Sequence, residues 1–156
     1  MQRDLRAVAD GALGGGAGTV AMSALMLAAR RAGLTGQLPP ERITAAALEG
    51  AGLETGARDE RALDLLTVGA HLGFGAGVGA LFGVLRRRLR PPGAAPLQGI
   101  VFGALVWLVS YRGWVPALGI LPPPERDRPG RPATMILAHL VFGAVLGLVV
   151  ERRRAG

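Results

Sequence analysis

The chain has 156 residues, of which half are hydrophobic and 19% are charged, with 25 glycines and no cysteine. Its length suits one domain and its composition a membrane protein, and the missing cysteine excludes disulfides, thiolate metal sites and cysteine nucleophiles. The net charge of +7 comes from arginines at the edges of apolar stretches, which argues against a nucleic-acid-binding face.

Four stretches without a charged side chain predict four transmembrane helices. They are residues 11–29, 65–85, 91–111 and 132–150. Each has about the 20 residues that span a hydrocarbon core of about 30 Å. The third stretch opens with prolines, so its helix is expected to begin near Pro96. A soluble bundle would need polar helix faces, and these stretches are apolar or glycine all round. We therefore predict an all-α, four-helix transmembrane bundle.

The loop after the first stretch contains a further short helix. It is predicted to run from Ile43 to about Gly50, because Pro39 and Pro40 precede it and a glycine follows its end. Its few large apolar side chains suggest that this external helix rests on the membrane surface.

The arginines predict the orientation of the bundle. Dense clusters follow the second stretch at 86–90 and the fourth at 152–154, which places both ends in the cytoplasm by the positive-inside rule. The other side has as many arginines, nine on each, but they are spread over two loops rich in Asp and Glu. Four spans then place both termini in the cytoplasm.

Two motifs occur twice along the chain. AHLGFGAGVG at 70–79 returns as AHLVFGAVLG at 138–147, and LPPER at 38–42 returns as LPPPER at 121–126. Such internal similarity indicates a duplicated structural unit.

The duplicated unit is predicted to be a helical hairpin. Repeat 1 covers about 7–90 and repeat 2 about 94–154, within a single transmembrane domain of residues 1–156. Because each repeat has an even number of spans, both copies share one orientation in the membrane.

Every predicted span carries two glycines four residues apart, the small-xxx-small packing motif. Four residues make about one helical turn, so each pair leaves a groove where another backbone can approach, within one chain or between chains. The pairs are Gly14 and Gly18, Gly75 and Gly79, Gly99 and Gly103, and Gly143 and Gly147. Gly16, Gly18 and Ala21 also fit a dinucleotide fingerprint, but no strand precedes them, so we expect packing.

His71 and His139 occupy matching positions of the repeat, near the middle of the membrane and on the glycine face of their helices. One interpretation is a neutral imidazole that donates to a backbone carbonyl of a neighbouring helix. The other is a ligand-binding or proton-relay role. The rings would meet if the second and fourth helices are central, and each would face a different helix if the first and third are. No further ligand or aromatic clamp for a haem is visible.

Arg112 stands between Tyr111 and Trp114 at the end of the third stretch. Aromatic residues at that level suit the membrane interface, and an arginine there can extend its side chain to water. The alternative is a buried arginine that binds an anion or a lipid head group. No catalytic constellation, metal motif or cofactor motif is recognisable, so we expect a protein that is not an enzyme.

The glycine-rich first helix, LPPER, Gln98 and Gly99 at the start of the third span, LPPPER, and the AHLVFG helix ending in arginines form a recognisable series. This series resembles the YagU-like family of bacterial inner-membrane proteins. The resemblance implies a multi-pass protein of the bacterial plasma membrane, linked to acid tolerance, and it carries over no reaction and no catalytic residue.

Two functions fit the sequence. The first is a non-enzymatic membrane component that acts through helix packing and through partners: the lipid bilayer, a second copy of the chain or another membrane protein. The second is a small transporter or channel subunit, suggested by the repeat and the histidine pair. A permeation path needs a polar lining, and the polar residues of the spans are few and scattered, which favours the first function. They are Thr19, Ser23, Thr67, Gln98 and Ser110.

The predicted orientation can be tested with topology reporters. A reporter fused at Gly156 should signal a cytoplasmic location, and one inserted near Gly56 should signal the opposite side, because one span separates each external loop from the cytoplasm. Identical signals from the two positions would contradict the four-span topology.

Overall fold

The computed structural model describes residues 2–53, 60–89 and 94–155. The sites proposed for reporters, Gly56 and Gly156, and the prolines at 91–92 lie outside this part of the chain. The described residues form helices and no strand, which confirms the all-α prediction. The elements are α1 (Gln2–Arg31), α2 (Pro39–Gly50), α3 (Glu60–Leu89), α4 (Ala95–Val109), the π-helical η1 (Ser110–Trp114), α5 (Val115–Ala117), the 3-10 helix η2 (Pro124–Arg126) and α6 (Arg131–Ala155).

Within the described residues, four helical segments are long and apolar enough to cross a membrane, as predicted. They are α1, α3, the continuous segment Ala95–Ala117 and α6. The third segment continues past its predicted end at Tyr111, since the backbone widens into the π-turn η1 and then forms α5. Arg112 does not end the helix because its side chain points outward and pairs with Glu125.

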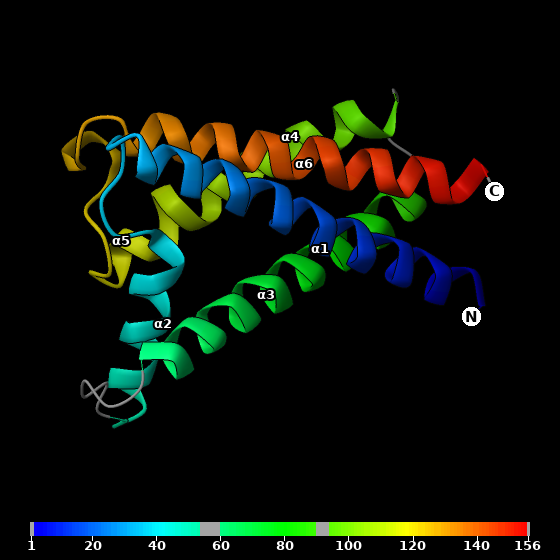
Figure 1. The fold of residues 1–156 in the computed structure, drawn as a ribbon. Coiled ribbons are helices and arrows are strands. Elements are labelled where there is room, and N and C mark those ends of the chain that lie inside the picture. The colour runs from blue at the N-terminus through cyan, green and yellow to red at the C-terminus, as the bar shows by residue number, and fades with distance from the viewer. Residues whose placement is uncertain (1, 54–59, 90–93, 156) are drawn as a thin grey trace.

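The order in which the long helices pack is α3, α1, α6, α4. The first and fourth spans, α1 and α6, are therefore the central pair, rather than the second and fourth or the first and third. The beginning of α1 and the end of α6 lie together at one end of the bundle, and α2 and α5 lie at the other (Figure 1).

Glycines bring the backbones of each hairpin into direct contact. A Cβ atom added to Gly15 of α1 would overlap the carbonyl of Gly75 of α3. In the same way, a Cβ atom added to Gly99 of α4 would overlap the carbonyl of Gly143 of α6. Close approach of this kind maximises van der Waals contact, which drives helix association where lipid replaces water. The helix pair α1 and α3 and the helix pair α4 and α6 thus use matching contacts. The duplication of the sequence itself stays a prediction.

The α1–α6 contact uses a second glycine face of α1. Gly14 lies against Leu146, and Gly18 lies against the ring and carbonyl of Phe142. Gly15 of α1 and Gly99 of α4 make matching contacts, so they occupy equivalent positions. Three residues later α1 has Gly18 and α4 has Phe102.

The predicted packing glycines all lie at helix contacts within one chain.

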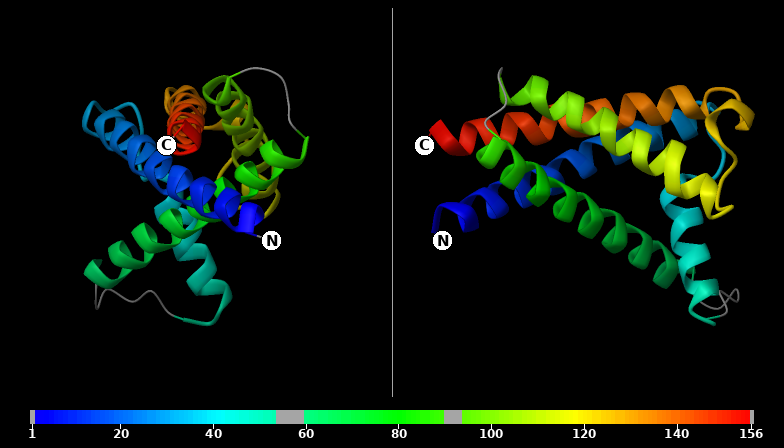
Figure 2. Two further views of the ribbon diagram at one scale, coloured as in Figure 1. Left: turned by 90° about the vertical axis from the view of Figure 1, so that its right-hand side faces the viewer. Right: turned by 180° about the vertical axis from the view of Figure 1, so that it is seen from behind.

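The side chain of Phe102 lies between the backbones of α4 and α3. These two helices meet where the rings of Phe82 and Phe102 lie with their centres 5.2 Å apart. Beyond this contact α3 diverges from α4 towards α2 (Figure 2). The bundle is consequently open on one side, between α3 and α4.

Two glycines with positive φ end the first and third spans. Gly33 (φ 75°) follows α1 and Gly119 (φ 70°) follows α5. At the first of these ends, the N–H groups of Gly33 and Leu34 donate to the carbonyls of Arg30 and Ala29, which is a Schellman motif. A left-handed residue is needed there, and glycine adopts it without strain.

Ion pairs join the helices at the arginine-rich end. Arg153 of α6 donates to Asp10 of α1 at 2.6 Å, and Arg87 of α3 pairs with Asp4 of α1. Asp10 of α1 thus pairs with a residue of another helix. These partly exposed pairs fix the relative register of α1, α3 and α6 more than they add stability.

Replacing Gly79 by alanine is expected to lower the free energy of unfolding by about 1–3 kcal/mol, because the added Cβ would collide with the backbone of Gly11 and Gly15. Gly77 is the matched control on the same helix, since a Cβ there meets nothing within 4 Å. Reversible unfolding of both variants in mixed micelles measures the difference. Equal stabilities would contradict the α1–α3 interface.

Candidate functional site

A cavity of about 280 Å³ occupies the opening between α3 and α4. All five described helices longer than a single turn contribute to its walls, together with η1 and α5, and most lining atoms are apolar. The lining residues are Thr19, Met22, Met26, Pro39, Pro40, Ile43, Thr44, Thr67, Ala70, His71, Phe74, Gly75, Val106, Ser110, Tyr111, Trp114, Val115, Met135, His139 and Phe142.

Helix α2 forms the end wall of the cavity. Its first residue, Pro39, is buried, and Thr44 is buried one turn later. Ile43 packs against the hydrophobic core. Glu41 fixes the start of the helix by accepting from the N–H of Leu38 at 3.1 Å. The helix that the sequence placed on the membrane surface is therefore also part of the cavity.

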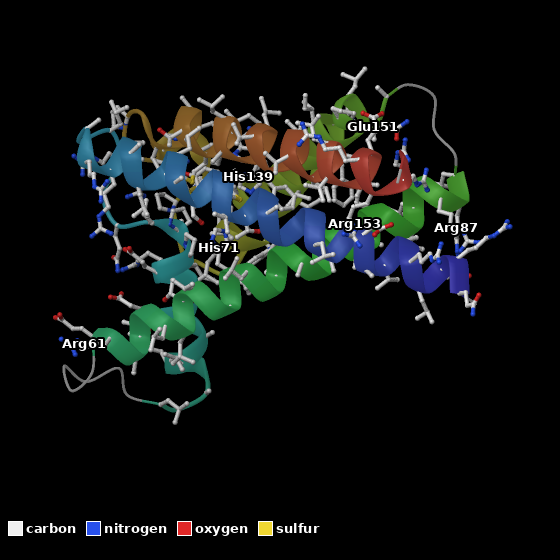
Figure 3. All side chains as sticks on the ribbon, turned by 45° about the vertical axis from the view of Figure 1, so that its right-hand side comes forward. Arg61, His71, Arg87, His139, Glu151 and Arg153 are labelled. Atoms are coloured by element: carbon white, nitrogen blue, oxygen red, sulfur yellow. The ribbon has the colours of Figure 1, made fainter. Side chains whose placement is uncertain are left out.

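Both histidines line the cavity, one from α3 and one from α6. They lie nearer to α2 than to the arginine-rich end of the bundle (Figure 3). Nδ1 of His71 lies 3.3 Å from the hydroxyl of Ser23 on α1. Nδ1 of His139 donates to the carbonyl of Met135, one turn earlier on its own helix, at 2.7 Å. One interpretation of the sequence proposed a bond from each imidazole to a carbonyl of a neighbouring helix. Within the described residues neither histidine makes such a bond.

The polar residues of the spans gather around this cavity. Thr19, Thr67 and Ser110 line it, and Ser23 bonds to His71. The interpretation of these residues as scattered is wrong for all but Gln98, which bonds to Arg86 at the other end of the bundle. Sequence spacing could not show the gathering because these residues belong to three different helices.

The hydroxyl groups in the cavity differ in their hydrogen bonds. Thr19 donates to the carbonyl of Gly15 at 2.8 Å, and Ser110 donates to that of Val106 at 2.6 Å. Such bonds to the preceding turn satisfy a hydroxyl inside an apolar helix. The hydroxyl of Thr67 is buried and has no hydrogen-bond partner among the residues that the structure describes. It is therefore one polar group of the wall that protein contacts leave unsatisfied.

The π-turn η1 places Ser110, Tyr111 and Trp114 on the cavity wall. The extra residue of a π-turn rotates the following side chains relative to a regular α-helix, and such turns are frequent at functional sites. No feature of the sequence predicted this turn.

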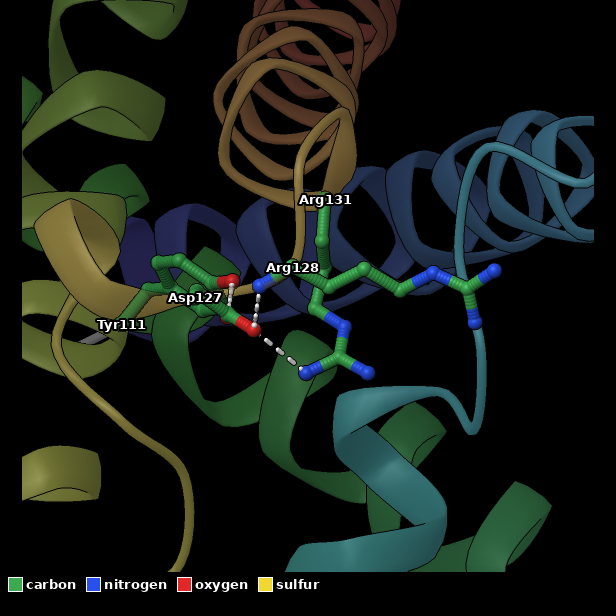
Figure 4. A network of polar contacts seen from close by, with 4 residues as sticks. All are labelled: Tyr111, Asp127, Arg128 and Arg131. Atoms are coloured by element: carbon green, nitrogen blue, oxygen red, sulfur yellow. Dashed lines mark hydrogen bonds and ion pairs between the residues drawn. The ribbon is translucent and has the colours of Figure 1, made fainter.

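A buried polar network closes the same end of the bundle (Figure 4). The hydroxyl of Tyr111 donates to Asp127, which also accepts from the backbone N–H of Arg128 at 2.7 Å and from Nη1 of Arg131 at 2.6 Å. The side chain of Asp127 is 1% exposed and that of Arg131 is 12% exposed. The sequence did not predict this network. Its only signal there is the density of charged residues in the loop before α6.

Arg112 lies outside the cavity. Its guanidinium pairs with Glu125 at 2.5 Å, and both side chains are about half exposed, at 53% and 55%. This position is the one expected of an arginine that extends towards water from a helix end. Within the described ranges, no three His, Asp or Glu side chains come together as metal ligands would.

Removing the carboxylate of the buried network is expected to destabilise the protein strongly. Asp127→Ala leaves Arg131 buried without its partner, which costs about 3–5 kcal/mol. Glu125→Ala is the matched control, because the exposed pair that it breaks contributes about 0–1 kcal/mol. Unfolding of the two variants under one set of conditions gives the comparison. Similar losses would show that Asp127 is not buried in a network.

No curated protein and no solved structure matches the chain. The resemblance to the YagU-like family therefore stays a prediction. The sequence profile of a family of unknown function, DUF6789, matches residues 5–155. This match includes all four long helices and every residue that lines the cavity. The chain belongs to the DUF6789 family of unknown function.

Proposed function

We propose that the protein is a non-enzymatic integral membrane protein that binds a small apolar molecule in the cavity between α3 and α4. The observation that supports this function is the cavity of about 280 Å³ with apolar walls. Cavities of about 150 Å³ with such walls bind benzene. The volume here suits a benzene ring with a short alkyl chain.

The ligand would enter from the bilayer. Ala70 and Phe74 of α3 line the cavity, yet both are exposed on the outer surface of the bundle, Phe74 to 50%. In a membrane this surface faces lipid rather than water. An apolar molecule dissolved in the bilayer therefore reaches the cavity without crossing a polar layer.

The polar groups of the site support binding rather than catalysis. Ser23 and His71 are a nucleophile and a base by residue type, but Ser23 does not line the cavity, and no third group orients the imidazole. A hydrolase also needs donors that stabilise an oxyanion, and the first two residues of α2 at the cavity, Pro39 and Pro40, have no backbone N–H to offer. The arrangement thus lacks the parts of a catalytic site.

A second candidate is a transporter subunit, favoured by the polar residues and histidines that share one cavity. Transport needs a path that continues towards the arginine-rich end. That path is closed where the rings of Phe82 and Phe102 meet and where Gly79 contacts Gly11 and Gly15. Binding from one side is therefore the better-supported function.

The proposed setting is the bacterial inner membrane with both termini in the cytoplasm. The arginine clusters after α3 and in the last turn of α6 support this orientation, since they lie at the same end of the bundle. The four predicted glycine pairs are used inside one chain. The proposal accordingly rests on the cavity and not on oligomerisation.

Binding is testable with para-butyltoluene and protein in lipid nanodiscs. Methyl groups of Met22, Met26 and Met135 line the cavity, so their NMR signals should shift as the probe is added. Val106→Phe fills the cavity and should abolish these shifts. Val109→Phe is the control, because Val109 is on the same helix but outside the lining. Equal probe effects in the two variants, or none in the native protein, would contradict the proposed site.

A further inference from the structure

His139 presents a hydrogen-bond acceptor to the cavity. Its Nδ1 lies 2.7 Å from the carbonyl oxygen of Met135. A carbonyl can only accept, so Nδ1 carries the hydrogen. In a neutral imidazole the other nitrogen, Nε2, then has a lone pair and no hydrogen. The hydrogen bond within α6 therefore decides the chemistry that the ring offers to a ligand.

No protein group is shown to satisfy this acceptor. Nδ1 makes the only hydrogen bond of the His139 side chain within the described part of the structure. The neighbouring hydroxyls of Thr19 and Ser110 donate to carbonyls of their own helices. The hydroxyl of Tyr111, from the π-turn, donates to Asp127. These three hydroxyls of the wall are thus committed elsewhere, and no hydrogen bond joins the side chain of Thr44, Thr67 or Trp114 to His139 within the described residues.

We infer that the ligand is an apolar molecule with one hydroxyl group, a phenol or an alcohol, whose O–H donates to Nε2 of His139. This inference rests on the proposed function and specifies its ligand class. A ketone or an ether at that position would place one acceptor against another. A hydroxyl instead supplies the missing donor, and the rest of the molecule contacts Met135, Phe142 and the other apolar walls.

Charged ligands are excluded by the same walls. An ammonium group could also donate to Nε2, but a buried cation needs a carboxylate, and none of the described residues that line the cavity carries one. A carboxylate ligand would need a cation, and Arg131 is bound to Asp127 outside the lining. A neutral hydroxyl fits both constraints.

His71 offers the complementary group. Ser23 can donate its hydroxyl hydrogen to Nδ1 of His71, 3.3 Å away, and Nε2 of that ring then carries a hydrogen. The cavity in this arrangement holds one imidazole acceptor and one imidazole donor. A hydroxyl is a ligand group that can serve either of them.

The test compares para-butylphenol with para-butyltoluene, which has a methyl group in place of the hydroxyl. Dissociation constants come from the methionine methyl signals, after correction for partitioning into protein-free nanodiscs. The phenol should bind the native protein about five- to tenfold more tightly, the effect of one hydrogen bond. In His139→Asn the amide N–H can still donate to Met135, but Nε2 is gone, so the two probes should bind equally.

A second measurement does not depend on the folding of a variant. In native protein with isotope-labelled histidine, the Nε2 signal of His139 should shift with the phenol and not with the toluene. Equal affinities of the native protein for both probes, without that shift, would overturn the hydroxyl inference and leave the cavity as a binding site. If neither probe moves the methionine signals, the proposed function fails and the inference fails with it.

Discussion

Direct contact between helix backbones at glycine is the constraint on which this structure depends. Lipid is as apolar as the side chains it surrounds, so no hydrophobic force holds the helices together, and close packing must do so. α1 has two glycine faces and therefore packs against two helices. Gly15 meets Gly75 of α3, and Gly18 meets Phe142 of α6. The central position of α1 follows from this double face.

The cavity follows from the absence of such a second face on α4. Where α1 has Gly18, α4 has Phe102, and the ring of this residue meets Phe82 instead of letting the backbones approach. The first helix of one hairpin, α1, thus packs closely against two long helices, and the first helix of the other, α4, against one. The bundle is therefore asymmetric, and its opening lies between α3 and α4, the side on which α4 carries Phe102.

Polar groups make this opening more than a packing defect. An unfilled apolar gap loses dispersion contacts, and the site combines such a gap with imidazoles and an unsatisfied hydroxyl at Thr67. The buried pair of Asp127 and Arg131 holds the π-turn that carries Tyr111 and Trp114 onto the wall. Buried polar groups are costly in a membrane, so their concentration at one end of the bundle indicates a functional site.

Local pattern was enough to predict the four long helices and one contact face on each of them, but not the second face of α1, which Gly11 and Gly15 form against α3. Uncharged stretches of sufficient length predicted the four spans, and glycines four residues apart predicted which faces pack, since helical spacing fixes what shares a face. Which face meets which helix follows from the packing of the whole bundle. The packing depends on the fit between residues far apart in the sequence, such as Gly18 and Phe142, and on the bulk of Phe102. The gathering of Thr19, Thr67 and both histidines at one cavity is its consequence, and no spacing along the chain encodes it.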